Sequence, residues 1–182
     1  AIADAVNGLI SFLPQLTATK AVDKSSFEPK ASQSYDLTYT LSIKNTSTRN
    51  SGTKPIEVDG QTINAVVLLD ELPANTTFKS AKANNSKALV LYPLGQDKFT
   101  QQIPNDKSLI NTLVVAYPQA LAANVTETVE LVVTMNSNIR RTSISNIFSV
   151  EHGLVSSIKK TLSNEVVTTV GGSSSITNNS KD

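Results

Sequence analysis

The chain has 182 residues, with 16 Lys or Arg against 15 Asp or Glu, so its formal net charge at pH 7 is +1. This balance excludes a polybasic nucleic-acid-binding protein, because no excess of cations exists to neutralise phosphates. Cys is absent and His occurs once, which argues against thiol chemistry, disulfides, an ordinary hydrolase and a metalloenzyme. We therefore expect no cofactor and no metal site, and no membrane span, since no apolar run approaches the roughly 18 residues that one needs.

The first fourteen residues differ from the rest of the chain. Their apolar side chains, from Ile2 to Leu13, recur at spacings of three and four, and Pro14 follows them. This spacing predicts a short helix over residues 1–14, with an extended arm as the alternative.

From residue 15 onward, apolar and polar side chains alternate with a period of two, which is typical of strands with one buried face. The segment Ile63–Leu69 is apolar on both faces and predicts a central strand. The polar segment 45–61 is expected to be a long loop or hairpin excursion. Strands are expected at 16–22, 35–44, 63–69, 77–81, 88–92, 109–117, 126–135, 143–151 and 162–170.

Turn signals between these strands indicate an all-β domain, a β-sandwich with Greek-key connections, of about seven to nine strands over residues 15–170. The Gly- and Ser-rich segment 171–182 is expected to be a flexible tail. His152, beside Gly153 at the end of an expected strand, is expected at a turn or on the surface.

Four segments, in this order, resemble a known module of surface proteins: Leu16–Asp23, Tyr39–Asn45, Leu69–Phe78 and Ser145–Val150. The module is the bacterial and archaeal repeat known as domain of unknown function eleven, which is similar to pilin and adhesin domains that form internal isopeptide bonds. The corner segment departs from the pattern, since Asn75 stands where the family has Gly; Asn tolerates the left-handed conformation nearly as well. The resemblance implies an immunoglobulin-like sandwich, export to the cell surface or the extracellular space, and use as a stalk or adhesive spacer.

Three polar residues are expected in the core on the basis of the strand period. Lys20 shares a face with Leu16, Asn146 shares a face with Phe148, and Asp70 ends the strand that is apolar on both sides. Buried charges must pair, become neutral or react. Burial lowers the pKa of Lys and raises the pKa of Asp, which leaves a nucleophilic amine and a carboxyl that can carry a proton.

These residues predict a covalent crosslink. Attack by the Lys20 amine on the Asn146 carboxamide, with Asp70 as proton shuttle, would release ammonia and leave an isopeptide bond worth about 4 kcal/mol on the loop-entropy model. Asn164, predicted on the face of Leu162 and Val166, is a rival acceptor; the spacing in the related pilins favours Asn146. The alternative without chemistry is an ion pair between Lys20 and Asp70, with the amine reaching the sandwich edge.

The leading interpretation is a non-enzymatic structural, stalk or adhesive module of a bacterial surface or secreted protein, whose partners are the neighbouring domains of that protein. A second hypothesis is a module that binds a glycan or a protein through segments 45–61 and 84–106. An enzyme would need paired carboxylates, as in glycoside cleavage, and no sequence argument brings two of them together.

Overall fold

The computed structural model describes residues 15–30, 33–136, 141–153 and 157–171. Within these ranges the chain forms fourteen strands and one turn of 3-10 helix, η1 (Lys107–Leu109), and no α-helix. The all-β prediction is confirmed, with more strands than the seven to nine expected. The helix or arm predicted over 1–14 and most of the predicted tail lie outside the described residues. No helix in the described ranges has the length and apolar character that crossing a bilayer requires.

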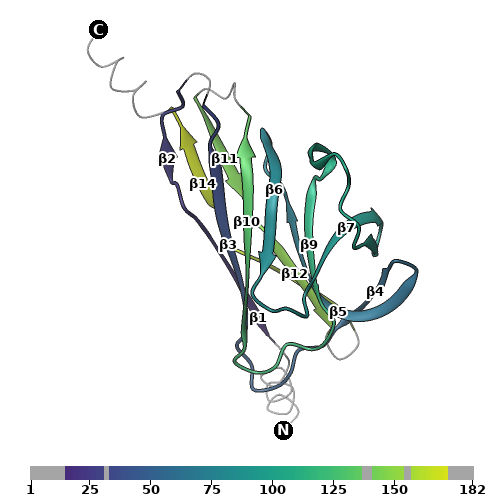
Figure 1. The fold of residues 1–182 in the computed structure, drawn as a ribbon. Coiled ribbons are helices and arrows are strands. Elements are labelled where there is room, and N and C mark those ends of the chain that lie inside the picture. The colour runs from purple at the N-terminus through teal and green to yellow at the C-terminus, as the bar shows by residue number, and fades with distance from the viewer. Residues whose placement is uncertain (1–14, 31–32, 137–140, 154–156, 172–182) are drawn as a thin grey trace.

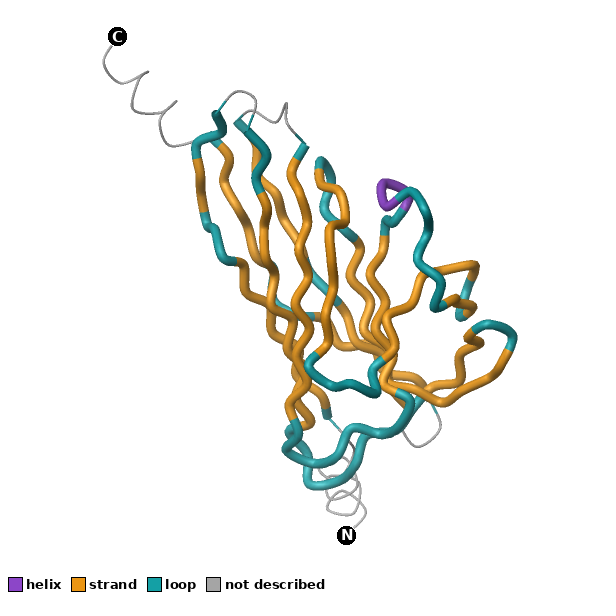
Figure 2. The backbone as a smooth tube through the Cα atoms, viewed as in Figure 1, coloured by secondary structure: helices purple, strands orange, loops and turns teal. Residues whose placement is uncertain are grey.

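Strands are distributed along the whole length of the described chain (Figures 1 and 2). They are β1 (Leu16–Val22), β2 (Ser26–Phe27), β3 (Asp36–Asn45), β4 (Lys54–Val58), β5 (Gln61–Glu71), β6 (Thr76–Ala83), β7 (Leu89–Gly95), β8 (Lys98–Thr100), β9 (Thr112–Tyr117), β10 (Thr126–Met135), β11 (Thr142–Asn146), β12 (Ser149–Gly153), β13 (Ile158–Leu162) and β14 (Val166–Val170).

The described strands form three sheets. One has the order β1-β3-β10-β6, a second has the order β11-β14-β2, and the third runs β13-β12-β5-β4-β8-β7-β9. Figure 1 shows an elongated body: β1 begins near the lower end and β14 finishes at the upper end. The described chain therefore enters and leaves at opposite ends of its long axis.

The predicted alternation builds the main core. On β3, Leu37, Tyr39, Leu41 and Ile43 are all fully buried, while Thr40 and Lys44, on the opposite face, are exposed. The strand lies between β1 and β10, paired antiparallel with both. The strand thus has one buried face and one solvent-exposed face, as the period of two predicts.

Strand β5 is buried on both faces, as predicted for residues 63–69. Val66 and Leu68 point into the main core, and Ala65 and Val67 point into a second, smaller apolar cluster. Since side chains alternate along a strand, Asp70 falls on the same face as Leu68, toward the main core. The corner that follows contains Asn75 at φ 66°, the left-handed conformation that the sequence predicted there.

The five strands that supply the second cluster pair with one another in a closed ring. Strand β5 pairs with β4, β4 with β8, β8 with β7, β7 with β9, and β9 with β5 again. Segment 45–61, predicted as a long loop or hairpin excursion, therefore contains β4, and segment 84–106, where the strand 88–92 was predicted, contains the β7–β8 hairpin. Ile56, Val58, Leu91 and Phe99 from these segments are buried in the cluster.

Two predicted strands are each divided in the structure. The expected strand 143–151 is β11 followed by β12, because the chain leaves its pairing with β14 and joins β5 after Asn146. Ile147, at this change of sheet, is 40% exposed. The expected strand 162–170 begins only at β14, and Leu162 closes the preceding strand β13.

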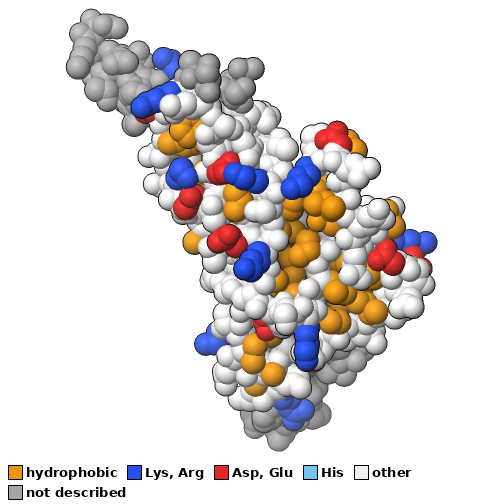
Figure 3. Space-filling model, in the orientation of Figure 1, with side chains coloured by type: hydrophobic (Ala, Val, Ile, Leu, Met, Phe, Trp, Pro, Cys, Tyr) orange, Lys and Arg blue, Asp and Glu red, His pale blue; other side chains and the backbone are white. Residues whose placement is uncertain are grey.

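The surface carries a mixture of charges. Figure 3 shows Lys and Arg side chains interspersed with Asp and Glu over the sheet of β1, β3, β10 and β6, and hydrophobic side chains between β6 and β7. This face presents no broad region of one sign, in keeping with the near-zero net charge.

Candidate functional site

Lys20 lies in the interior, as its strand period predicts. It sits in the middle of β1, opposite Leu41 of β3, and is 5% exposed. Its Nζ contacts Asp70 Oδ2, and both side chains have no exposed surface. The structure thus places an amine and a carboxyl against each other in the main core.

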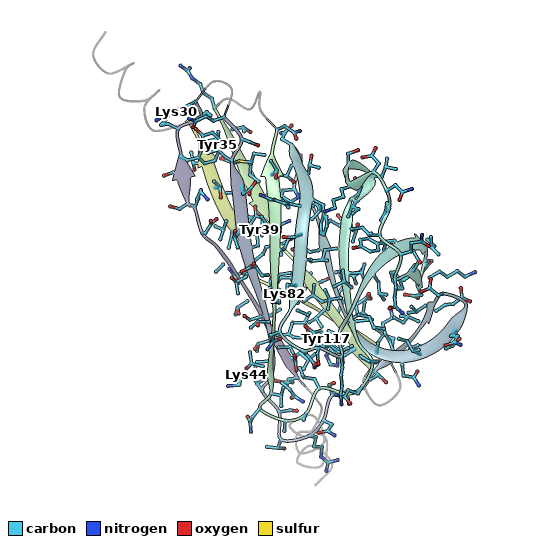
Figure 4. All side chains as sticks on the ribbon, viewed as in Figure 1. Lys30, Tyr35, Tyr39, Lys44, Lys82 and Tyr117 are labelled. Atoms are coloured by element: carbon cyan, nitrogen blue, oxygen red, sulfur yellow. The ribbon has the colours of Figure 1, made fainter. Side chains whose placement is uncertain are left out.

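Two aromatic rings flank the Lys20 amine. Nζ lies 4.5 Å from the ring centroid of Tyr39 and 5.9 Å from that of Phe148. Tyr39 is labelled on β3 in Figure 4. The sequence analysis did not place either ring beside the Lys20 amine. The position of Tyr39 on β3, the strand that pairs with β1, could have indicated its contact with Lys20. The rings hold the amine away from water and restrict its rotamers.

Asn146 lies next to Asp70, and its side chain influences the pKa of that carboxyl. It is the last residue of β11 and is 5% exposed, and its Nδ2 donates a hydrogen bond to the Glu71 carbonyl oxygen at 2.9 Å. Among the described residues, neither Asp70 Oδ1 nor Asn146 Oδ1 has a hydrogen-bond partner.

Burial favours the neutral form of both ionisable groups. It lowers the pKa of Lys20 against the opposing influence of Asp70. It raises the pKa of Asp70 against the opposing influence of Lys20 and of hydrogen bonding with the Asn146 side chain. A neutral amine is a nucleophile and a protonated carboxyl is an acid, so the site holds both reagents for attack on a carboxamide.

Asn164 does not share this environment, which corrects its predicted inward position. It is exposed, as is Leu162, which is 60% exposed. Its carboxamide is bound to the backbone of Lys20: Oδ1 accepts from the Lys20 N–H at 2.8 Å, and Nδ2 donates to the Lys20 carbonyl at 2.9 Å. The predicted face failed because β13 ends at Leu162 and the strand period does not continue into β14.

His152 is fully buried rather than at a turn or on the surface. The end of β12 packs tightly against the residues before β4: a Cβ on Gly52 would lie 2.2 Å from the Gly153 carbonyl oxygen. His152 Nδ1 lies 3.1 Å from the carbonyl oxygen of Gly153, and within the described part of the chain Nε2 has no partner. Burial lowers the pKa of this side chain.

We expect His152 to make stability depend on pH. Its ordinary pKa is 6.5 and burial depresses it, so the unfolded chain binds the proton more readily and the free energy of unfolding falls as pH drops below that value. The slope is at most about 1.4 kcal/mol per pH unit for one proton. Urea unfolding of wild type and His152→Gln from about pH 7 to pH 5 checks this. Equal slopes in the two proteins would contradict it.

A groove of about 700 Å³ lies beside the site, on the side of Asn146 and Glu71. At one wall, the amine of Lys54 lies 2.9 Å from Asp97 Oδ1 and 3.4 Å from Glu151 Oε1. Leu162 contributes exposed apolar surface to the same groove. In the ranges that the structure describes, no three His, Asp or Glu side chains gather as a metal site would require.

Comparison with solved structures finds a similar fold in bacterial surface proteins. A single-residue variant of BcpA, the major pilin subunit of Bacillus cereus, superposes with a TM-score of 0.55 at 8% identity, over 86% of this chain and 40% of that chain. A Corynebacterium diphtheriae protein described as membrane anchored gives a TM-score of 0.50 at 11% identity, over 87% and 36%. The full-length major pilin SpaD of the same organism gives 0.49 at 18% identity, over 84% and 34%.

No family model matches the chain, and no curated protein matches it either. At these identities the structural likeness concerns the fold: the chain shares an all-β architecture with part of a pilin subunit. It spans well under half the length of the chains that it resembles.

Proposed function

We propose that this chain is a non-enzymatic extracellular module of a bacterial surface or secreted protein, with a structural or adhesive role, and that an isopeptide bond between Lys20 and Asn146 stabilises it. The folded module comprises residues 15–170 as one immunoglobulin-like sandwich, akin to the repeat known as domain of unknown function eleven. Its partners are the neighbouring domains of the parent protein. The fold shared with part of a pilin supports this assignment.

One observation carries the crosslink: a fully buried Lys20–Asp70 pair with Asn146 next to Asp70. An ion pair without solvent recovers little of the cost of desolvation, and replacing such pairs by apolar residues is often neutral or stabilising. The pair is therefore poorly explained as a stabilising contact alone. A reaction that consumes the amine removes the buried charge altogether.

The reaction balances without any further reagent. Lys20 Nζ attacks Asn146 Cγ, the bond from Cγ to Nδ2 breaks, and the product is a secondary amide plus one ammonia. Asp70 protonates the carboxamide oxygen and delivers the amine's proton to the leaving nitrogen. The Glu71 carbonyl, which accepts from Nδ2 at 2.9 Å, orients the leaving group. Holding the groups together replaces a bimolecular encounter, the source of large effective molarities.

The position of the bond suits a load-bearing module. Lys20 is on the first strand, and Asn146 is on β11, which pairs with β14, the last described strand. Tension applied at the two ends would pass along β1 to Lys20, through the bond to Asn146, and onward along the chain to β14. Most of the chain, between residues 20 and 146, would carry no load.

Intact mass of the purified protein tests the proposal. We expect a mass below the sequence value by one ammonia, and tandem mass spectrometry should find a peptide containing Lys20 linked to one containing Asn146. Lys20→Met, which keeps the apolar stem and removes the nucleophile, should have the full mass. Loss of water instead of ammonia would mean that Asp70 is the acceptor. A wild-type mass equal to the sequence value would refute the bond.

A second candidate function is recognition of a glycan or a protein ligand, and the groove beside Asn146 favours it. Deleting residues 45–61 would not test this, since β4 supplies Ile56 and Val58 to the second cluster. Leu162→Asp alters the groove at an exposed position, and Val167→Asp is a matched control outside it, at 40% exposure. Glycan-array binding that Leu162→Asp removes and Val167→Asp retains would support recognition. Equal binding by both variants would contradict a site in this groove.

A further inference from the structure

We propose that Ser163 and Asn164 form a positioning bridge that fixes Lys20 of β1 relative to the segment directly after Asn146 for bond formation. This inference rests on the proposed crosslink. The bridge is the two-residue segment directly after β13, and it acts through the backbones of Lys20 and Phe148 rather than on the reacting atoms.

The side chain of Asn164 hydrogen-bonds to the backbone of Lys20 on β1. Its carboxamide accepts from the Lys20 N–H at 2.8 Å and donates to the Lys20 carbonyl at 2.9 Å. Strand β1 is the edge of its sheet, so these two backbone groups of Lys20 point away from β3 and would otherwise be unpaired. The Asn164 carboxamide therefore pairs with both the N–H and the carbonyl of Lys20, as a residue on a neighbouring antiparallel strand would.

Ser163 binds the chain two residues after Asn146, in the short segment between β11 and β12. Its N–H donates to the Phe148 carbonyl at 2.9 Å, and its Oγ accepts from the Phe148 N–H at 3.0 Å. The same hydroxyl donates to the Asn164 carbonyl at 2.8 Å, which ties the two halves of the bridge together. Ser163 is buried, at 7% exposure. Both backbone groups of Phe148 are thus fixed by one residue.

The bridge matters because the two reacting strands belong to different sheets. Strand β1 lies in the sheet with β3, and β11 pairs with β14. Within the described residues no ladder joins β1 to β11 or β12. The relative position of the two reacting residues therefore depends on contacts such as this bridge. Reaction rates are sensitive to such placement, and a displacement of about 1 Å can cost about 100-fold.

The test measures the rate of bond formation on full-length protein made by cell-free synthesis, quenched in acid at intervals and weighed intact. We expect Asn164→Ala to slow the loss of ammonia by about tenfold or more, with the same pH dependence as wild type, because the chemistry is untouched. Asn164→Asp, which retains only the acceptor for the Lys20 N–H, should be intermediate at the pH of maximum rate. Circular dichroism checks that each variant is folded.

Asn45→Ala is the matched control. Asn45 is fully buried and its Nδ2 donates to the carbonyls of Arg49 and Leu121, at 2.7 and 2.8 Å, far along the chain from Lys20. This variant should form the bond at the wild-type rate despite losing stability. A wild-type rate in Asn164→Ala, or equal slowing in Asn45→Ala, would overturn the positioning role. If wild type itself never loses ammonia, the crosslink fails, and the positioning role fails with it.

Discussion

Replacing Asn146 by alanine is expected to lower the free energy of unfolding by about 4 kcal/mol relative to the crosslinked protein. A bond between residues 20 and 146 closes a loop over most of the chain, so it restricts the unfolded ensemble strongly. The variant keeps Lys20 and Asp70, so no unpaired buried charge is created. Urea unfolding monitored by circular dichroism measures the difference.

The slope of the unfolding curve separates the lost bond from lost packing. A crosslinked unfolded chain exposes less surface, so wild type should have a smaller m value than Asn146→Ala. Asn45→Ala also loses hydrogen bonds of a buried carboxamide, but it keeps the crosslink and should keep the wild-type m value. A fall in stability in Asn146→Ala with no change in m would show that the wild-type chain has no covalent tie there.

The inward position of the three site residues could be predicted from the strand period. Lys20 follows Leu16 by four residues, and Asn146 precedes Phe148 by two, so each points into the core wherever its neighbour does. Asp70 required one further inference, that the strand before it is buried on both sides. The structure places all three at 5% exposure or less. Periodicity was sufficient here because each residue lies within or at the end of one regular strand.

Periodicity failed where strands are short, exposed or change sheets. Strand β13 is mostly exposed and so has no alternation, and β4 contains Pro55, which usually argues against a strand. At Ile147 the chain passes from one sheet to another, and the alternation ends at Phe148, since Ser149 and Val150 that follow are both buried. The hydrogen bonds from the Asn164 side chain to the Lys20 backbone form directly after β13, in this irregular part of the chain. A contact between residues 144 positions apart leaves no pattern in the sequence around either.

The role of Asp70 gives the largest expected effect on rate. Asp70→Asn keeps the shape of the side chain and leaves Lys20 and Asn146 in place, but it removes the acid. Burial lowers the pKa of Lys20, and Asp70 opposes that effect, so removing the carboxylate lowers the pKa of the amine further and favours its nucleophilic form. We expect bond formation to slow by about 100- to 10,000-fold, the usual contribution of general acid–base catalysis. The ammonia-loss time course measures it, and a wild-type rate would contradict the shuttle.

The pH profile distinguishes a lost acid from a disturbed fold. In wild type the reactive state holds one proton on the pair, with a neutral amine and a protonated carboxyl. At low pH the amine of Lys20 is protonated, and at high pH Asp70 loses its proton, so the rate should be bell-shaped, with two apparent pKa values that belong to the pair. In Asp70→Asn only the amine titrates, so the residual rate should rise with pH and then level off. A bell-shaped profile that persists in Asp70→Asn would mean that another group supplies the proton.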